Sequence, residues 1–287
     1  MHAPDTKKLK LDGLQRHGEG VWLRGGRAHL AMRLREADLV ASDVDECMLP
    51  FIGQAHAGLY VLRRVVGSAN TPREIRLATR MSARAAALLA QKMYHKVTGW
   101  GQNSRLIMQF EDFVMDAPLK YFASSARKLV HHGLDGVDCA IRIFNERNVP
   151  FGMISLGVDL VIEPYRAHLE NTHGARVAFT DCTRTLENHG TFGGYDPTGT
   201  MSMPEHKAER VRARTREYGA LHPLVIGHDR DDMGMFRAAR ELGGLALGFN
   251  PVPDTYPLLD IAVFSDNWHA LAGLLAAMLQ EPCATAL

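Results

Sequence analysis

The feature that most constrains this chain is a short hydrophobic run that ends in two acidic residues. Residues 39–41 read Leu-Val-Ala and are followed by Ser42-Asp43-Val44-Asp45. A short apolar run of this kind predicts a buried strand of an α/β sheet. Because open parallel sheets form their sites at the carboxyl ends of the strands, Asp43 and Asp45 are the first candidate site residues. Taken alone, the pair is also typical of solvated or helix-capping acids.

The alternation of helix and strand patterns continues along the chain and predicts an α/β core. Strands are expected over residues 39–41, 149–155, 221–226, 245–249 and 261–264. Helices are expected over residues 28–37, 137–147, 204–218, 233–242 and 271–279. Ser202-Met203-Pro204-Glu205 has the form of a capping box, so Ser202 is expected to cap the helix that carries Lys207 in its first turn.

A different pattern interrupts this alternation between about residues 53 and 147. Apolar residues there recur at the spacing of one helix face: Leu77, Met81, Ala85, Leu88, Leu89 and Met93. The segment is therefore predicted to be a helical insertion after the first strand. We accordingly expect an N-terminal extension over residues 1–36, a core domain over 37–51 and 148–287, and a helical cap domain over 52–147.

Composition limits the class of partner. The 287 residues carry 33 Lys and Arg against 32 Asp and Glu, a formal net charge of +1. Such a chain lacks the broad basic surface that a nucleic-acid backbone or an anionic membrane attracts. The N-terminal residues lack the apolar run of a signal peptide, and the four cysteines form no CxxC pair. We expect a cytoplasmic protein that binds neither nucleic acid nor membrane; the sequence leaves its oligomeric state open.

Four polar groups follow one another in an order that suits phosphoryl transfer. After Asp43 and Asp45 come Ser155 at a predicted strand end, Lys207 early in a helix, and an acidic loop over residues 227–232 that follows another strand. Phosphoryl transfer needs a nucleophile, a proton donor for the leaving oxygen, cations and hydrogen-bond donors. Individually, Ser155 is also explained as a strand end and Lys207 as one cation of a solvated helix face.

In this order the motifs resemble those of the haloacid dehalogenase (HAD) superfamily, in particular its phosphoserine-phosphatase-like branch with a helical cap. The resemblance covers residues 39–264, and includes Phe151-Gly-Met-Ile-Ser155-Leu-Gly157 and Leu247-Gly-Phe-Asn250-Pro-Val-Pro. It implies a Rossmann-like parallel sheet core, an aspartyl-phosphate mechanism and Mg²⁺ at the strand ends. The substrate would be a small phosphorylated metabolite, and the enzyme a phosphoric monoester hydrolase.

The resemblance also implies roles for individual residues. Asp43 would attack phosphorus, and Asp45 would protonate the leaving alcohol and then activate water. Ser155 would hydrogen-bond the phosphate, helped by the backbone N–H of Leu156 or Gly157, and Lys207 would offset negative charge. The metal would lie among Asp43, the backbone carbonyl of Asp45 and the acidic loop, which supplies Asp229, Asp232 and His228.

The loop departs from the family at its principal metal ligand. The family has Gly-Asp there, with a second acid four residues after that Asp, and this chain has Gly227-His228, with Asp232 as the later acid. Mg²⁺ prefers oxygen ligands, so His228 favours either a shift of the role to Asp229 or a cation such as Mn²⁺ or a softer transition metal. Alternatively, His228 acts on substrate protonation or is only hydrogen-bonded within the loop.

Substrate identity and two other functions stay open at the level of sequence. Phosphoserine phosphatases have a Glu nine residues after the nucleophile, where this chain has Ile52, so phosphoserine is a poor expectation. Halide displacement by Asp43 is a second possible reaction, although Asp45 argues against it because a halide needs no proton. A HAD-like binding or regulatory protein whose His228 impairs metal binding is the third, since a fold alone does not fix function.

Overall fold

A single large sheet organises the molecule. The computed structural model describes residues 11, 13–98 and 104–280. Their eight-stranded sheet has the order β1-β2-β10-β9-β8-β3-β4-β5, and the strands from β10 to β5 run parallel. The strands are β1 (Gln15–Gly18), β2 (Val21–Leu23), β3 (Leu39–Ser42), β4 (Phe151–Val158), β5 (Phe179–Thr183), β8 (Pro223–Gly227), β9 (Leu245–Phe249) and β10 (Ile261–Val263). The predicted α/β fold with a mostly parallel sheet is confirmed.

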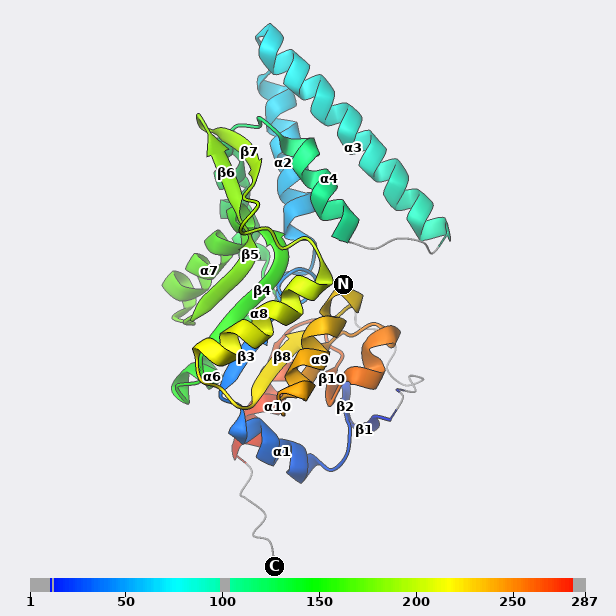
Figure 1. Cartoon of the computed structure of the whole chain (residues 1–287), viewed down its shortest axis with the longest axis vertical. Helices are drawn as coiled ribbons and strands as arrows, with labels where there is room; N and C mark the ends of the chain where they lie inside the picture. The colour runs from blue at the N-terminus through cyan, green and yellow to red at the C-terminus, as the bar shows by residue number, and fades with distance from the viewer. Residues whose placement is uncertain (1–10, 12, 99–103, 281–287) are drawn as a thin grey trace, which may run out of the picture.

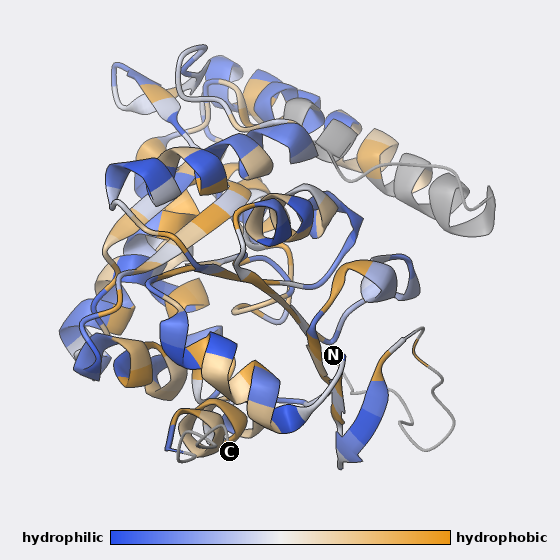
Figure 2. Ribbon diagram, turned by 60° about the horizontal axis from the view of Figure 1, so that its bottom comes forward, coloured by the Kyte–Doolittle hydropathy of each residue, from blue (hydrophilic) through white to orange (hydrophobic). Residues whose placement is uncertain are grey.

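Helices cover both faces of this sheet because its central strands are apolar on both sides. In β3, Leu39 and Ala41 pack into one hydrophobic cluster and Val40 into the other, and Figure 2 shows the hydrophobic strands between layers of helices. One layer contains α1 (Arg27–Glu36), α6 (Val137–Glu146), α7 (Asp159–His173) and α10 (His269–Gln280), and the other contains α8 (Pro204–Glu217) and α9 (Met233–Glu241). Short 3₁₀ turns are η2 (Val130–His132), η3 (Arg230–Asp232) and η4 (Pro253–Leu258).

Four helices form a separate group beyond the carboxyl end of β3 (Figure 1): α2 (Gly53–Ser68), α3 (Pro72–Thr98), α4 (Ser104–Val114) and α5 (Leu119–Leu129). The hairpin of β6 (Thr185–Asn188) and β7 (Thr191–Tyr195) joins them. Phe192 of this hairpin stacks on Phe122 of α5 with ring centroids 5.9 Å apart. The helical insertion is observed after the first parallel strand, as its sequence pattern predicts.

Two segments pack against the core although the sequence analysis placed them in other domains. The sequence pattern assigned α6 to the cap, yet this helix packs against α10 and β4 of the core. Residues 15–36 lie in the expected N-terminal extension, and β2 among them pairs with β10 while Trp22 is 2% exposed. Residues 1–10 and 12 of that extension lie outside the described residues. We therefore propose that the core includes residues 15–36 and α6.

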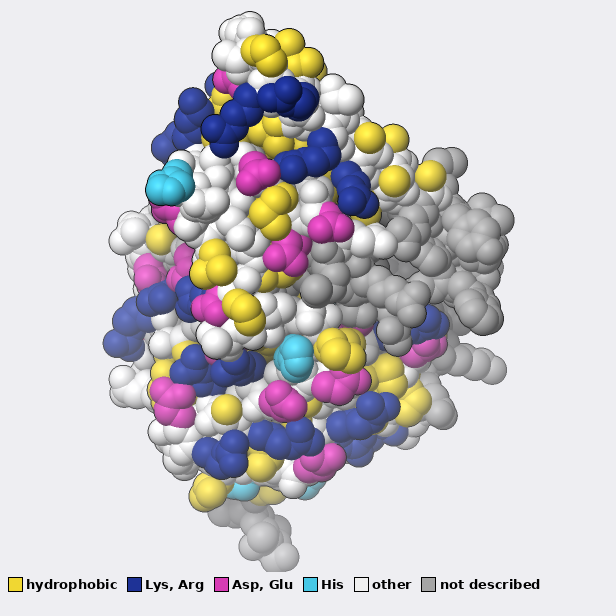
Figure 3. Space-filling view, turned by 45° about the horizontal axis from the view of Figure 1, so that its top comes forward, with side chains coloured by type: hydrophobic (Ala, Val, Ile, Leu, Met, Phe, Trp, Pro, Cys, Tyr) yellow, Lys and Arg dark blue, Asp and Glu magenta, His cyan; other side chains and the backbone are white. Residues whose placement is uncertain are grey.

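The surface and the cysteines agree with ordinary globular packing. On the face drawn in Figure 3, Lys and Arg side chains are interspersed with Asp and Glu. Among the described residues, no helix combines the length and the apolar character that crossing a bilayer requires. Cys47 and Cys182 are buried and Cys139 is partly buried, whereas Cys283 lies outside the described residues.

Candidate active site

The carboxyl ends of β3, β4 and β8 meet at one small cavity of about 60 Å³. Parallel strands deliver their following loops to the same sheet edge, which is why residues far apart in sequence converge there. The cavity is lined by Asp43, Asp45, Glu46, Ile52, Gln54, Ser155, Leu156, Gly157, Lys207, His228, Asp229 and Asp231. Nearly all of the residues that the sequence analysis singled out are thus brought together. Asp232 lies next to this cavity, with its Oδ2 3.4 Å from His228 Nδ1.

Lys207 forms ion pairs with the carboxylates of Asp43 and Asp232. Its Nζ lies 2.6 Å from Asp43 Oδ1 and 2.7 Å from Asp232 Oδ1, and all three side chains are at most 3% exposed. Burial opposes the charge on Lys207, but Asp232 and Asp43 outweigh that effect and raise the pKa of Lys207 well above its usual value. Although burial works to raise it, the pKa of Asp232 lies below its usual value because Lys207 and His228 favour its ionised form. Lys207 and Asp232 are therefore both charged at neutral pH.

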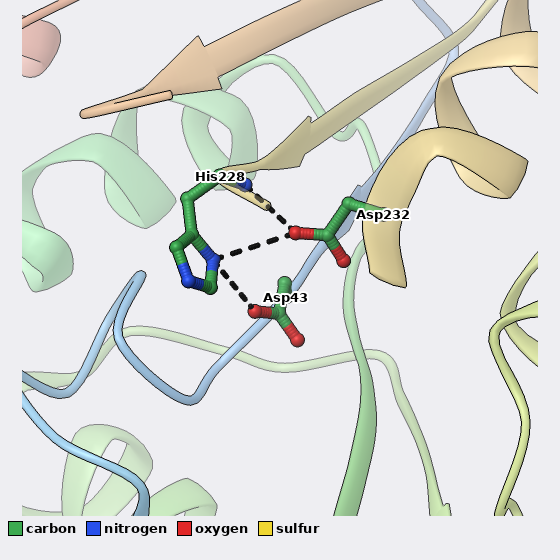
Figure 4. Close-up of side chains that lie close together, drawn as sticks. All are labelled: Asp43, His228 and Asp232. Atoms are coloured by element: carbon green, nitrogen blue, oxygen red, sulfur yellow. Dashed lines mark hydrogen bonds and ion pairs between the residues drawn. The ribbon is translucent and has the colours of Figure 1, made fainter. Parts of the chain in front are cut away.

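His228 lies between the same two carboxylates (Figure 4). Its Nδ1 is 3.3 Å from Asp43 Oδ2 and 3.4 Å from Asp232 Oδ2. The ring is 9% exposed, and Nδ1 is buried without a hydrogen bond of good geometry among the described residues. Burial works to lower the pKa of His228, but the carboxylates of Asp232 and Asp43 outweigh it and raise this pKa well above its usual value. Nδ1 is placed where either a proton or a cation would sit between two anions.

The loop after β8 is held in shape by its own carboxylates. Asp232 Oδ2 accepts hydrogen bonds from the backbone N–H of His228 at 2.7 Å and of Asp229 at 3.3 Å. Asp229 in turn caps η3 by accepting from the N–H of Asp231 at 2.8 Å. A Cβ on Gly227 would lie 2.7 Å from the Asp232 carboxylate, so this close approach requires glycine.

Asp45 also lines the cavity. Its Oδ1 accepts a hydrogen bond of 2.7 Å from the N–H of Gly53, and a Cβ on Gly157 would lie 2.9 Å from its Oδ2. Burial, reinforced by the charge of Asp43, raises the pKa of Asp45 to about 7 despite the hydrogen bond from Gly53. A carboxyl group with this pKa exchanges a proton readily near neutral pH.

Ser155 lies inside β4 and not at its end, because the strand extends to Val158. The pairing of β4 with β5 shifts between Ile154 and Val158, which is typical of a bulge beside a site. Within this irregularity the Ser155 Oγ accepts a hydrogen bond of 2.9 Å from the N–H of Gly157. The Ser155 hydroxyl hydrogen takes no part in this bond and can donate to another group. The Gly157 N–H, in contrast, already donates to Ser155 Oγ.

The sequence prediction of a capping box was wrong. Met203 occupies the N-cap of α8 without a side-chain hydrogen bond, and the backbone N–H of Ser202 instead donates to His206 Nδ1. Pro204 still begins the helix, since proline suits a first turn whose N–H groups have no helical acceptor. Lys207 consequently keeps its predicted place in the first turn.

Asp43, His228 and Asp232 could hold a metal ion, since one ligand atom of each lies within 4.8 Å of the others. Asp229 is close by, with Oδ2 3.8 Å from His228 Nε2. The Asp45 carboxylate instead contacts Gly53. Of the five residues expected around the metal, three therefore form one group of side-chain ligands.

Sequence reasoning missed Gln54, which also lines the cavity. Gln54 lies in the first turn of α2 and is 5% exposed. Its Oε1 atom is buried and has no hydrogen-bond partner in the part of the chain that the structure describes. Its sequence signal was only its position eleven residues after Asp43, in a segment with no other polar pattern. Glu46, also on the cavity wall, has a positive φ of 57°, a conformation that favours glycine.

This chain resembles known proteins in its three-dimensional structure. No family model matches the sequence, and no curated protein matches it either. A probable phosphoserine phosphatase from Vibrio cholerae superposes with a TM-score of 0.62 at 12% identity, covering 86% of this chain and 66% of that one. The chain thus spans just under two thirds of that protein's length.

Two further solved structures are similar to this chain. A phosphoserine phosphatase captured as a phospho-aspartyl intermediate analogue has a TM-score of 0.54 at 14% identity, covering 79% of this chain and 93% of that one. A cytosolic 5'-nucleotidase IIIB bound to cytidine has a TM-score of 0.59 at 11% identity, covering 88% of both chains. At these identities the likeness shows a common fold.

Proposed function

We propose that this chain, which has the fold of the haloacid dehalogenase superfamily, is a divalent-metal-dependent phosphomonoester hydrolase acting on a small phosphorylated metabolite. The observation that carries the proposal is the buried Asp43–Lys207–Asp232 triad at the carboxyl ends of parallel strands, with the half-buried acid Asp45 beside it. Similarity to phosphoserine phosphatases and to a 5'-nucleotidase supports it.

In the proposed reaction, an Asp43 carboxylate oxygen attacks phosphorus while the bond from phosphorus to the ester oxygen breaks. Asp45 gives its proton to the departing oxygen, so that an alcohol leaves and an aspartyl phosphate forms on Asp43. Asp45, now ionised, takes a proton from water, whose oxygen attacks phosphorus and releases inorganic phosphate. Asp43 is thereby regenerated.

The other residues act on charge and orientation. Lys207 offsets negative charge near Asp43, at 2.6 Å from its Oδ1, and remains charged because of its raised pKa. Ser155, whose Oγ already accepts from Gly157, can donate its hydroxyl hydrogen to a phosphoryl oxygen. Leu156 and Gly157 contribute to the cavity wall. The cavity of about 60 Å³ limits water near the reacting atoms.

The side chains fit Mn²⁺ or a softer transition-metal cation better than Mg²⁺. The three-residue group supplies carboxylates from Asp43 and Asp232 and one imidazole nitrogen from His228. Among the described residues, the buried Nδ1 atom of His228 makes no hydrogen bond of good geometry. Mixed oxygen and nitrogen ligands suit Mn²⁺ and other transition metals, whereas Mg²⁺ demands oxygen. When bound there, such a cation would neutralise charge on the transferring phosphoryl group.

Phosphate release tests the proposal directly. The wild-type protein should release inorganic phosphate from an aryl phosphate and from some members of a panel of small phosphate esters, with Mg²⁺ or Mn²⁺ present. Release should disappear with a chelator and return when metal is restored. If no ester is hydrolysed with either metal, the chain is a binding protein with a HAD fold, and halide release from 2-haloacids would instead identify a dehalogenase.

Replacing His228 by Asp should change the preferred metal. An all-oxygen ligand set favours Mg²⁺, so we expect His228→Asp to bind Mg²⁺ at least about tenfold more tightly and to lose preference for Mn²⁺. Isothermal titration calorimetry of each metal into both proteins measures this, without substrate. The control is His206→Asp, which makes the same substitution at a histidine outside the group of Asp43, His228 and Asp232. Equal Mg²⁺ affinities of wild type and His228→Asp would contradict the assigned ligand.

The pKa of Asp45 predicts the alkaline limb of the pH profile. An ordinary aspartic acid is protonated in only about 0.1% of molecules at pH 7, whereas a pKa of about 7 leaves about half of the Asp45 groups protonated. The value of kcat/KM for an alkyl phosphate should therefore fall about tenfold per pH unit above pH 7. Profiles of wild type and Asp45→Asn check this. A profile that stays flat from pH 6 to 9 in the wild type excludes Asp45 as the acid.

A further inference from the structure

The Oε1 atom of Gln54 is a buried acceptor that has no hydrogen-bond partner among the described residues. Five buried side-chain atoms among the described residues lack a hydrogen bond, and two of them, Gln54 Oε1 and His228 Nδ1, belong to residues that line the catalytic cavity. His228 has two carboxylates beside it. For Gln54 Oε1 the described residues supply no hydrogen bond, although the residue is only 5% exposed.

Such an arrangement is unfavourable unless something outside the chain completes it. An unsatisfied buried acceptor destabilises the fold, and folded proteins satisfy the great majority of their buried polar atoms. A leucine would fit the same space without that cost. The amide is therefore best explained by a ligand that hydrogen-bonds to Oε1 when the cavity is filled.

The position of Gln54 identifies which part of the ligand it meets. Gln54 lies one residue after Gly53, whose N–H holds the Asp45 carboxylate at 2.7 Å. Asp45 is the residue that contacts the leaving oxygen in the proposed reaction. Asp45 and Gln54 line the same small cavity of about 60 Å³. Gln54 thus stands beside the first atoms of the leaving group.

The charges around the cavity restrict that leaving group further. Three carboxylates besides the reacting pair line it, those of Glu46, Asp229 and Asp231, and they disfavour a second anion on the substrate. The residue nine positions after Asp43 is the apolar Ile52, so the carboxylate that would pair with an ammonium group there is missing from that position. The carboxylates disfavour an anionic leaving group, and a leaving group with a hydrogen-bond donor suits the buried acceptor of Gln54.

We propose that Gln54 is a specificity-determining residue that accepts a hydrogen bond from a hydroxyl group next to the ester oxygen, so that the enzyme selects phosphate esters of polyols or sugars. The inference rests on the proposed function, because it uses the placement of the phosphoryl group on Asp43. Oε1 accepts, and the substrate hydroxyl donates. No bond to Gln54 forms or breaks.

Four two-carbon esters that differ in one group test the selection: ethyl, 2-hydroxyethyl, 2-aminoethyl and carboxymethyl phosphate. We expect kcat/KM for the 2-hydroxyethyl ester to exceed that for the ethyl ester by about tenfold, the size of one hydrogen bond between uncharged groups. Gln54→Leu should remove this difference, and Gln54→Glu should shift preference toward the 2-aminoethyl ester. Gln15→Leu, on the exposed strand β1, is the matched control.

A binding experiment separates this inference from the proposed hydrolysis. Propylphosphonate and 3-hydroxypropylphosphonate imitate the first two esters but cannot be hydrolysed, and calorimetry with the metal-loaded protein measures their affinities. The hydroxylated compound should bind about tenfold more tightly to wild type and equally to Gln54→Leu. Thermal unfolding should show that Gln54→Leu is at least as stable as wild type, which a structural role for the amide would not allow.

Each outcome bears on the proposal. Tighter binding of 3-hydroxypropylphosphonate without turnover of any ester would support the role of Gln54 and reject the hydrolase. Equal affinity of wild type for the two phosphonates, or no binding of either, would overturn the role of Gln54 even if esters are hydrolysed. A preference of wild type for the 2-aminoethyl or carboxymethyl ester would overturn the substrate class.

Discussion

Asp43→Asn is expected to reduce phosphate release by about 10⁴-fold or more while the protein stays folded, because the variant loses the nucleophile and keeps its shape. Asp43 is 2% exposed at the end of β3, and its N–H donates to the Ile226 carbonyl at 2.9 Å. That backbone contact does not depend on the side chain. Lys207 keeps Asp232 as an ionic partner at 2.7 Å, so the loss of one carboxylate is tolerated.

The measurement compares single-turnover phosphate release and thermal unfolding for wild type and Asp43→Asn. Asp181→Asn is the matched control, because Asp181 is also a buried carboxylate, 7% exposed, and is paired with Arg214 at 2.8 and 2.9 Å. We assign no chemistry to Asp181, so this variant should lose some stability and retain turnover. If Asp43→Asn releases phosphate within tenfold of wild type, an aspartyl phosphate on Asp43 is not part of the reaction.

The parallel strands nearest the site could be predicted from sequence because each is locally apolar. β3 and β9 follow runs of Leu, Val, Ala and Phe with almost the predicted limits. β5 was missed because its sequence, Phe-Thr-Asp-Cys-Thr, has no such pattern. Its Asp181 is buried through a distant ion pair with Arg214 of α8, and a local pattern carries no information about such a partner.

The same distinction explains what was and was not predicted of the site. The order of motifs indicated Asp43, Asp45, Ser155 and Lys207, and the parallel order of β3, β4 and β8 brings the segments around their carboxyl ends to one edge of the sheet. The charge balance of the triad depends on contacts between residues 164 and 25 positions apart, which sequence alone does not specify. Gln54 is recognisable only from its missing hydrogen bond, a property of the folded chain.

Lys207→Met is expected to have the largest effect on stability, with activity lost as well. Methionine retains much of the side-chain volume but leaves the carboxylates of Asp43 and Asp232 facing each other, at 2% and 0% exposure. Removing one partner from a buried ionic cluster costs about 3–5 kcal/mol, which corresponds to a fall in Tm of about 10 °C for a domain of this size. Denaturant unfolding at pH 7 measures the change in free energy of unfolding.

The pH dependence of this loss follows from the directions of the two pKa shifts. The folded-state pKa of Asp232 lies below its unfolded value, so the ionised group stabilises the fold above about pH 4 and this stabilisation is lost as pH falls through the folded pKa. The folded-state pKa of Lys207 is raised, so its contribution is present below about pH 10. The difference in stability between wild type and Lys207→Met should therefore be greatest between about pH 5 and 9 and should shrink in acid.

A double variant separates charge compensation from packing. Lys207→Met combined with Asp232→Asn removes one cation and one anion together, so it should recover most of the stability that Lys207→Met alone loses. It should still release no phosphate, because the transferring group then lacks the positive charge of Lys207. If the double variant is as unstable as Lys207→Met, the methionine disturbs packing around α8. If Lys207→Met alone is as stable as wild type at pH 7, Lys207 does not neutralise the carboxylates of Asp43 and Asp232. The positive charge that stabilises them is then that of His228, which lies between them.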